Sequence, residues 1–254
     1  MMNTLFSVKG KTVLITGGSR GIGAMLAEGF VRSGATVFIS ARKPEELERC
    51  RARLAALGDC RSVVADLSTT AGALALAETL AAQTDTLDVL INNAGASWGA
   101  PLDQFPESGW DKVMDLNLKS LFFLTQRLLP QLRRASRPEA YASIINISSI
   151  YALMHSPLNT YSYSASKAAV IALTRQLAAE LQADHIKVNA IAPGYFPSAM
   201  TAPLDEQAMV ADIPAGRMGR LEDIAGTAIY LASTASDYMT GNTLALDGGV
   251  LASR

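Results

Sequence analysis

The segment YSASK places a tyrosine, Tyr163, and a lysine, Lys167, four residues apart. If the segment is helical, this spacing puts both side chains on one face of the helix. A phenol has a pKa of about 10 in water, so it is a poor acid near neutral pH unless its anion is stabilised. A neighbouring ammonium group stabilises the phenolate. The pair therefore has the residue types and the spacing for proton transfer to the alkoxide that develops when a ketone is reduced.

A glycine-rich loop lies near the N-terminus, in the segment VLITGGSRGIGAML. Gly17, Gly21 and Gly23 follow a strand-like run and open a helical pattern with the spacing G-x-x-x-G-x-G. Gly17 permits a tight turn, Gly21 lets a pyrophosphate approach the backbone, and Gly23 lets the helix pack against the sheet. The helix that begins at Ile22 points its amide groups and its dipole at the phosphates. The loop predicts a dinucleotide site.

The second strand-like run ends in FISARK and has no Asp or Glu between Val37 and Lys43. An acidic residue there would bind the ribose hydroxyls of NAD and repel a 2′-phosphate. Arg42 stands at that place, and Arg20 lies in the glycine loop. A guanidinium group matches a phosphate with two parallel hydrogen bonds. The pattern therefore favours NADPH, and the alternative is that Arg42 is a solvated loop residue.

The elements that must position these residues alternate between strand-like and helical patterns. The expected strands are Val13–Thr16, Thr36–Ser40, Ser62–Ala65, Val89–Asn92, Ser143–Ser148, Lys187–Ile191 and Thr243–Leu246. The expected helices are Ile22–Ser33, Pro44–Leu57, Thr70–Gln83, Asp111–Arg134, Ser164–Gln182 and Leu221–Ala232. The strands are continuously apolar, as strands buried on both faces are. This pattern predicts an α/β Rossmann fold, with a doubly wound, seven-stranded parallel sheet covered by helices on both faces, in one domain of residues 1–254.

Composition argues against several classes of protein. The net charge of −1, from 22 basic and 23 acidic residues, gives no electrostatic case for nucleic acid or an acidic membrane as a partner. No apolar run reaches the ~18 residues of a membrane span, and the N-terminus lacks the pattern of a signal peptide. Two cysteines and the absence of a His, Cys and carboxylate cluster predict no metal site. We expect a cytoplasmic protein.

The spacing of the glycine loop, TGGSRGIG, resembles the short-chain dehydrogenase/reductase family. The resemblance continues in family order through DLS, NNAG, DLNLKS, ISS, YSASK, PG and DGG, over essentially the whole chain. Within the family, the sequence is most similar to bacterial 3-oxoacyl reductases of the branch associated with rhamnolipid formation. This implies NADPH-dependent reduction of a ketone, most simply a 3-oxoacyl thioester. The alternatives are a small ketone, sugar acid or polyol as substrate, or a dinucleotide sensor without catalysis.

The resemblance also implies roles for the catalytic residues. Tyr163 is the general acid and base, and Lys167 lowers the pKa of Tyr163 and holds the nicotinamide ribose. Ser149, rather than Ser148, polarises the carbonyl group, although it lies one residue further from Tyr163 than is usual in the family. Asn117 marks a helix distortion whose free carbonyl binds water beside the lysine and completes a proton relay. From the residues alone, Asn117 would be a helical polar residue that faces solvent.

The remaining site residues follow from the same resemblance. Asp66 accepts a hydrogen bond from the adenine amino group, or instead caps the helix that follows Ser68, and Ser198 contacts the carboxamide. The predicted cofactor contacts are Gly17, Ser19, Arg20, Gly21, Ile22, Gly23, Arg42, Asp66, Leu67, Asn93, Ala94, Gly95, Tyr163, Lys167, Pro193, Gly194, Phe196 and Ser198. The predicted substrate contacts are Ser149, Tyr151, Met154, Tyr195 and Met200.

Two further expectations concern motion and assembly. Residues 193–213 combine prolines, small residues and methionines, which predicts a lid over the substrate, and the alternative is a surface helix with two packed methionines. The helices Asp111–Arg134 and Ser164–Gln182 carry apolar residues on more than one face, so a second subunit could bury them. With the family resemblance, this predicts a homo-oligomer, most simply a tetramer.

Overall fold

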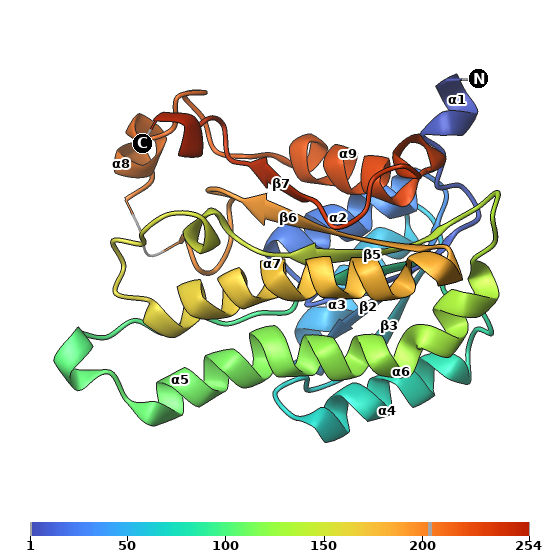
Figure 1. Cartoon of the computed structure of the whole chain (residues 1–254), viewed down its shortest axis with the longest axis horizontal. Coiled ribbons are helices and arrows are strands. Elements are labelled where there is room, and N and C mark those ends of the chain that lie inside the picture. The colour runs from blue at the N-terminus through green and yellow to red at the C-terminus, as the bar shows by residue number, and fades with distance from the viewer. Residues whose placement is uncertain (1, 203–204, 254) are drawn as a thin grey trace.

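Residues 2–202 and 205–253 are described by the computed structural model, in which helices cover both faces of a central sheet (Figure 1). Parallel strands follow the order β3-β2-β1-β4-β5-β6-β7. The strands are β1 Thr12–Thr16, β2 Thr36–Ala41, β3 Cys60–Val64, β4 Val89–Asn92, β5 Ala142–Ile147, β6 Ile186–Pro193 and β7 Thr243–Leu246. The order changes direction between β1 and β4, which opens a crevice outside their carboxyl ends. The predicted Rossmann fold with seven parallel strands is confirmed.

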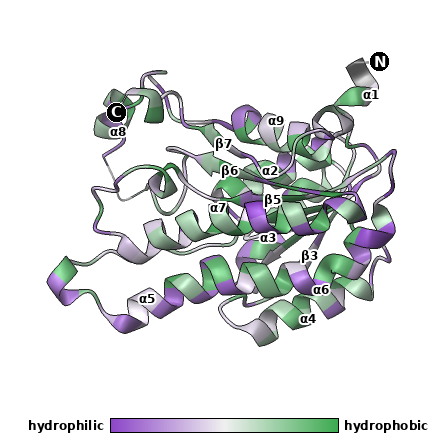
Figure 2. Ribbon diagram, in the orientation of Figure 1, coloured by the Kyte–Doolittle hydropathy of each residue, from purple (hydrophilic) through white to green (hydrophobic). Residues whose placement is uncertain are grey.

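The helices form one layer on each face of the sheet. The α-helices are α1 Met2–Leu5, α2 Gly21–Arg32, α3 Pro44–Ala55, α4 Thr70–Ala81, α5 Glu107–Met114, α6 Ser120–Ala135, α7 Tyr161–Leu181, α8 Glu206–Ala211 and α9 Leu221–Ala232. One core cluster joins α2, α3 and α9 to the sheet through residues such as Phe30 and Leu231. A second joins α4, α6 and α7 through residues such as Leu76 and Leu128. Hydrophobic and hydrophilic residues alternate along these ribbons (Figure 2), as amphipathic helices require.

Burial along the strands follows their place in the sheet. The inner strands β4, β5 and β6 are buried along their whole length, as their continuous apolar sequences predict. The edge strand β3 mixes buried and exposed residues. It begins before the predicted segment Ser62–Ala65, because pairing with β2 sets both of its ends. Cys60 lies opposite Val37, and Val64 lies opposite Ala41.

The single helix predicted at Asp111–Arg134 is divided in the structure. It begins at Glu107, ends at Ala135, and contains one π-helical turn at Asp115–Lys119. A π turn holds one extra residue and redirects the side chains around it. Here it accompanies the burial of Asn117, which is only 2% exposed. The distortion that the family resemblance implies at Asn117 is therefore present.

The start of α7 and the stretch after Pro193 also differ from expectation. α7 begins at Tyr161, three residues before the predicted start at Ser164. The stretch after Pro193 contains the short helix α8, within the segment for which a surface helix was the alternative to a lid. Asp205 starts α8 as its N-cap, because its Oδ1 accepts hydrogen bonds from the amides of Gln207 at 2.9 Å and Ala208 at 3.3 Å.

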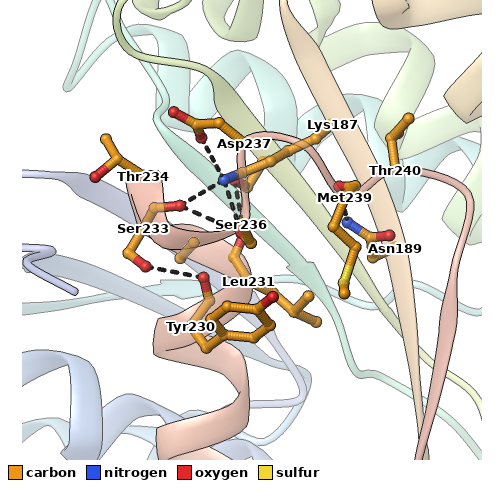
Figure 3. A network of polar contacts seen from close by, with 12 residues as sticks. Lys187, Asn189, Tyr230, Leu231, Ser233, Thr234, Ser236, Asp237, Met239 and Thr240 are labelled. Carbon is orange, nitrogen blue, oxygen red and sulfur yellow. Dashed lines mark hydrogen bonds and ion pairs between the residues drawn. The ribbon is translucent and has the colours of Figure 1, made fainter. Parts of the chain in front are cut away.

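A buried lysine joins β6 to the segment between α9 and β7 (Figure 3). The Lys187 side chain is 1% exposed, and its Nζ donates to the carbonyl oxygen of Ser233 at 2.6 Å. It also donates to Oγ of Ser236 at 2.8 Å and to Oδ1 of Asp237 at 2.7 Å. Burial lowers the pKa of Lys187, and the neighbouring Asp237 carboxylate partly opposes this. All three protons of the ammonium group have acceptors, which makes this lysine a structural cross-link.

We expect Lys187→Met to lower the free energy of unfolding by about 2–4 kcal/mol, because it strands a buried carbonyl, a hydroxyl and a carboxylate. Urea denaturation of the two proteins measures the difference. Arg133→Met is the matched control, because Arg133 forms an ion pair with Asp184 in which the two side chains are 52% and 31% exposed, respectively. An exposed pair contributes about 0–1 kcal/mol. Equal losses in both variants would contradict a structural role for Lys187.

Candidate active site

The glycine loop leaves β1 in a conformation that only glycine adopts easily. Gly17 and Gly21 have φ angles of 66° and 52°. A Cβ at Gly23 would overlap the carbonyl oxygen of Gly17, so α2 packs against the loop only without a side chain there. Arg20 precedes α2 but makes no side-chain cap. The first amides of α2 are therefore open to an anionic ligand, and this cradle fits a dinucleotide's phosphates. Ile22 belongs to the same first turn.

The loop after β4 braces the glycine loop. Oγ1 of Thr16 accepts from the amides of Asn93 at 3.0 Å and Ala94 at 2.9 Å. Nδ2 of Asn93 donates to the carbonyl oxygens of Thr16 at 2.8 Å and Gly17 at 3.2 Å. The predicted cofactor residues 93–95 therefore lie beside the glycine loop, and the Asn93 side chain is engaged by the protein. Sequence analysis missed Thr16 as a support, although it directly precedes the first glycine.

The structure brings the predicted catalytic serine and tyrosine together. Ser149 follows β5, where its Oγ accepts a hydrogen bond from the amide of Tyr151 at 3.2 Å. Its hydroxyl is close enough to the Tyr163 side chain, which is partly buried at the start of α7, to influence the pKa of the phenol. Ser148 instead donates its hydroxyl to the carbonyl oxygen of Lys167 at 2.8 Å and anchors the helix. The rival Tyr161 is exposed, and its hydroxyl is 3.5 Å from Oδ1 of Asn159. The geometry therefore favours Ser149 and Tyr163 over both alternatives.

Lys167 lies close to the ring of Tyr163. Its Nζ is 5.7 Å from the centre of the Tyr163 ring and donates to the carbonyl oxygen of Ile147 at 2.7 Å. The residue is 4% exposed, and burial lowers its pKa to about 8. Burial also raises the pKa of Tyr163, and the neighbouring Ser149 hydroxyl opposes this only in part. The pKa of Tyr163 is therefore raised rather than lowered, because burial of the phenol outweighs the opposing interaction.

Asn117 connects three parts of the site. Its Oδ1 accepts from the amide of Ala96 at 2.8 Å, and its Nδ2 donates to the Ala96 carbonyl and to Oγ of Ser166, both at 3.0 Å. A Cβ at Gly95 would lie 3.3 Å from Asn117 Oδ1 and 3.6 Å from Lys167 Nζ, so these groups surround that glycine. The interpretation of Asn117 as a solvent-facing residue is wrong. Sequence analysis missed Ser166, although it is next to Lys167.

The residues predicted for the adenosine end lie at the carboxyl ends of β2 and β3. Arg42 is exposed, and its charge contributes to the lowered pKa of Asp66. The larger cause is the amide of Ser68, which donates to Asp66 Oδ1 at 3.0 Å. Asp66 does not cap the next helix, because Thr69 does so by accepting from an amide of α4. The Leu67 side chain is buried in the core, so only its backbone could contact a cofactor.

The predicted nicotinamide contacts follow β6, which ends at Pro193. The Gly194 amide donates to the Leu246 carbonyl at 2.9 Å and fixes this loop to β7. Phe196 is 3% exposed and packs in the core cluster that includes Phe30 and Leu231, and its contact with a cofactor stays a prediction. A Cβ at Gly21 would lie 3.3 Å from Cβ of Ser198. Ser198 therefore lies next to the glycine loop. This place is compatible with the cofactor contact that the sequence predicts for it.

Four of the five predicted substrate residues lie at one place. The hydroxyls of Tyr151 and Tyr195 are 2.9 Å apart, and their rings meet edge to face. Met154 packs against the same apolar cluster, which begins directly after Ser149. This cluster comprises Ile150, Tyr151, Met154, Tyr195, Ile213, Met218, Val250 and Leu251. Met200 is 47% exposed and is not among its members.

The predicted lid, residues 193–213, is partly helical. Residues 203 and 204 of this segment lie outside the described part of the chain. Met209, on α8, is buried, whereas Met200 is exposed, so the alternative of two packed methionines holds for one of them. Closure of the segment over a ligand stays a prediction.

Two kinds of feature are absent from residues 2–202 and 205–253. Within these ranges, no three His, Cys, Asp or Glu side chains are grouped closely enough to hold a metal ion. None of the helices described there has the length and apolar character needed to cross a membrane. Cytoplasmic location stays a prediction.

Fold and site together define a dinucleotide-binding α/β oxidoreductase, and comparison with known proteins agrees. A family model described as enoyl-(acyl carrier protein) reductase matches residues 17–251. The chain belongs to the short-chain dehydrogenase/reductase family, and the resemblance drawn from the motifs is confirmed.

Particular relatives cover almost the whole chain. It is 51% identical to the rhamnolipids biosynthesis 3-oxoacyl-[acyl-carrier-protein] reductase of Pseudomonas aeruginosa, over 98% of this chain and 99% of that protein. The solved Pseudomonas aeruginosa RhlG/NADP active-site complex has a TM-score of 0.94 at 50% identity, covering 97% of this chain and 98% of that one. A gluconate 5-dehydrogenase of Burkholderia cenocepacia, solved with NADP and tartrate, has a TM-score of 0.91 at 32% identity, covering 99% of both chains.

Burial of Lys167 predicts a pH-dependent contribution to stability. Its pKa falls from 10.5 to about 8 on folding, so the unfolded chain binds more protons between these values. The contribution of Lys167 to the free energy of unfolding therefore rises with pH across that window and is lost as the pH falls through about 8. We expect wild type to gain up to about 1.4 kcal/mol per pH unit relative to Lys167→Met.

Urea denaturation of both proteins at a series of pH values from neutral to alkaline measures this gain. The other lysines whose pKa is lowered, Lys11 and Lys187, are common to both proteins, so their contributions cancel in the difference. A stability difference that stays constant over the whole series would show that Lys167 is not desolvated in the folded protein.

Proposed function

We propose that the chain is an NADPH-dependent reductase that converts a ketone, most simply a 3-oxoacyl thioester, into a secondary alcohol. The observation that carries this proposal is the grouping of Ser149, Tyr163 and Lys167 beside the glycine loop. A hydroxyl and a phenol that lie this close together can both donate to one carbonyl oxygen. The Pseudomonas aeruginosa relative at 51% identity is named for this reaction.

The side chains of the site account for the proton side of the reaction. Ser149 donates to the carbonyl oxygen of the substrate, and Tyr163 gives its proton to the alkoxide that develops there. Because burial raises the pKa of Tyr163, the phenol stays protonated at neutral pH, as a general acid must. Lys167 holds the nicotinamide ribose, and its charge stabilises the phenolate that remains. Bound NADPH supplies the hydride for the carbonyl carbon.

Asn117 acts as a positioning residue in this scheme. Its hydrogen bonds to Ala96 and Ser166 hold the loop after β4 against α7. The π turn around it changes the helical hydrogen-bond pattern, so a carbonyl there can bind water beside Lys167. Such a water connects the buried lysine to solvent and allows the tyrosine to be reprotonated.

Charge and backbone geometry support NADPH as the cofactor. The glycine cradle and the uncapped α2 suit the pyrophosphate, and Arg20 and Arg42 suit a 2′-phosphate. Solved relatives from Pseudomonas aeruginosa, Beutenbergia cavernae and Burkholderia cenocepacia carry NADP. The remaining contacts follow the predicted set, with Leu67 limited to its backbone.

The apolar cluster that begins after Ser149 favours an acyl substrate. Ile150, Met154 and Met218 offer no charge to a sugar carboxylate, and the Tyr151 and Tyr195 hydroxyls already contact one another. An apolar wall of this kind accepts alkyl chains and distinguishes them by only about 1–3 kcal/mol per methylene.

A sugar acid is the second candidate substrate. The chain is 39% identical to a 2-dehydro-3-deoxy-D-gluconate 5-dehydrogenase of Dickeya dadantii, over 99% of both proteins. The Tyr151 and Tyr195 hydroxyls are the groups of the cluster that could bind a polyol. A dinucleotide sensor without catalysis would have no need for the intact set of Asn117, Ser149, Tyr163 and Lys167.

The proposed enzyme is a homo-oligomer, most simply a tetramer. An apolar groove runs along α6 and α7 among the residues described. Its lining residues are Leu118, Lys119, Phe122, Phe123, Ala169, Ala172, Leu173 and Gln176. A second copy of the chain would remove this groove from water. Light scattering at micromolar concentration should give the mass of a dimer or tetramer, and a monomer would contradict the proposal.

Tyr163→Phe tests the reaction. Loss of a general acid lowers turnover by about 10²–10⁴-fold, so we expect this loss in kcat/KM for ketone reduction by NADPH. The Kd of the cofactor, measured by the quenching of protein fluorescence, should change little. Tyr161→Phe is the matched control, because Tyr161 is exposed and its hydroxyl lies near Asn159. Equal losses in the two variants would remove Tyr163 from the mechanism.

The same assay separates the substrate classes. Wild-type protein is given acetoacetyl thioesters, longer 3-oxoacyl thioesters and a keto sugar acid, each with NADPH. We expect the highest kcat/KM for a 3-oxoacyl thioester. Faster reduction of the sugar acid would favour the second candidate, and cofactor binding without turnover of any ketone would favour the sensor.

A further inference from the structure

Glu46 contacts two side chains that are predicted to bind the cofactor. It lies in the first turn of α3, shortly after the end of β2. Its Oε1 accepts a hydrogen bond from Oγ of Ser19 at 2.8 Å, and its Oε2 is 3.6 Å from a guanidinium nitrogen of Arg20. The Glu46 side chain is 25% exposed, against 58% for Arg20. The carboxylate therefore lies over the glycine loop and is held by both of these residues.

This place is otherwise suited to an anion. Ser19 and Arg20 belong to the loop that precedes the uncapped N-terminus of α2. Arg42, at the end of β2, adds a second positive charge, whose effect reaches Asp66 across the same edge of the sheet. Within the described residues, Arg42 has no carboxylate partner within 4.0 Å, whereas Arg20 has Glu46. A protein carboxylate thus already fills part of the predicted phosphate site.

A phosphate and a carboxylate cannot share these groups at low cost. Ser19 has one hydroxyl proton to donate, and it is directed at Glu46. Two negative charges at contact distance repel one another, most strongly where solvent is partly excluded. A ligand phosphate that binds Ser19 and Arg20 must therefore displace the Glu46 carboxylate.

We propose that Glu46 is a specificity-determining residue, whose carboxylate occupies the subsite of the adenosine 2′-phosphate and competes with it for Ser19 and Arg20. The inference rests on the proposed dinucleotide function. NADPH must move the carboxylate away, whereas NADH, with a 2′-hydroxyl, can bind while it stays. Glu46 therefore reduces the preference for NADPH that Arg20 and Arg42 create.

The test measures binding of fragments that differ at the 2′-position. Isothermal titration calorimetry gives the Kd of adenosine 2′-monophosphate and of adenosine 5′-monophosphate for wild type, Glu46→Gln and Glu45→Gln. Glu46→Gln keeps the shape of the side chain and an acceptor for Ser19 but removes the charge. Glu45→Gln removes an equal charge from the same turn of α3, where the side chain is exposed.

We expect Glu46→Gln to lower the Kd of adenosine 2′-monophosphate by about five- to tenfold. The Kd of adenosine 5′-monophosphate should stay within about twofold of its wild-type value. Glu45→Gln should leave the Kd values of both monophosphates within about twofold of wild type. The ratio of the Kd values of NADP⁺ and NAD⁺ should shift toward NADP⁺ in Glu46→Gln only.

Three results would overturn the inference. The 2′-monophosphate affinity could stay unchanged in Glu46→Gln, or both glutamate variants could tighten it equally, which indicates a general effect of charge. A weaker affinity of Glu46→Gln for NAD⁺ would mean that the carboxylate binds ribose hydroxyls. Failure of wild type to bind either NADP⁺ or NAD⁺ would instead reject the proposed function, so the two failures are distinguishable.

Discussion

The hydrogen bonds of the Asn117 side chain are the interaction on which the site depends. A single buried amide joins the loop after β4, the π turn and α7, through Ala96 and Ser166. Because Ser166 is adjacent to Lys167, this amide also fixes the helix turn that carries the lysine and Tyr163. The π turn is the local distortion that accompanies the inward direction of Asn117, whose side-chain oxygen and nitrogen both have hydrogen-bond partners.

Two buried lysines show how the same residue serves structure and chemistry. Lys187, near the start of β6, meets a carboxylate, a carbonyl and a hydroxyl, so its charge is compensated. Lys167 is equally hidden but contacts one carbonyl at the end of β5, and its pKa falls to about 8. A desolvated ammonium group with N–H donors still free is suited to bind a ligand's hydroxyls. The parallel sheet separates these roles, since its carboxyl edge carries the site.

Sequence patterns were sufficient for the fold, because they depend on local rules. Apolar strands alternating with amphipathic helices specify a parallel sheet, and glycine spacing specifies a turn that few other residues can adopt. The family motifs predicted Ser149, Tyr163 and Lys167 as catalytic residues, and helical periodicity placed two of them on one face. The family is confirmed by whole-chain relatives. The boundaries of β3 and α7 were missed, since pairing and packing set the ends of elements.

What the sequence determined by itself is therefore the order of elements, the family and the types of chemical group in the site. The tertiary structure decided which groups meet and what their surroundings do to them. Burial, which depends on residues far apart in the chain, raised the pKa of Tyr163 where a lowered value was expected. The tertiary structure also packs Phe196 in the core. It brings Glu46 into contact with Ser19, 27 residues away in the sequence. Such contacts have no local signature, because desolvation and charge pairing arise only when the chain is folded.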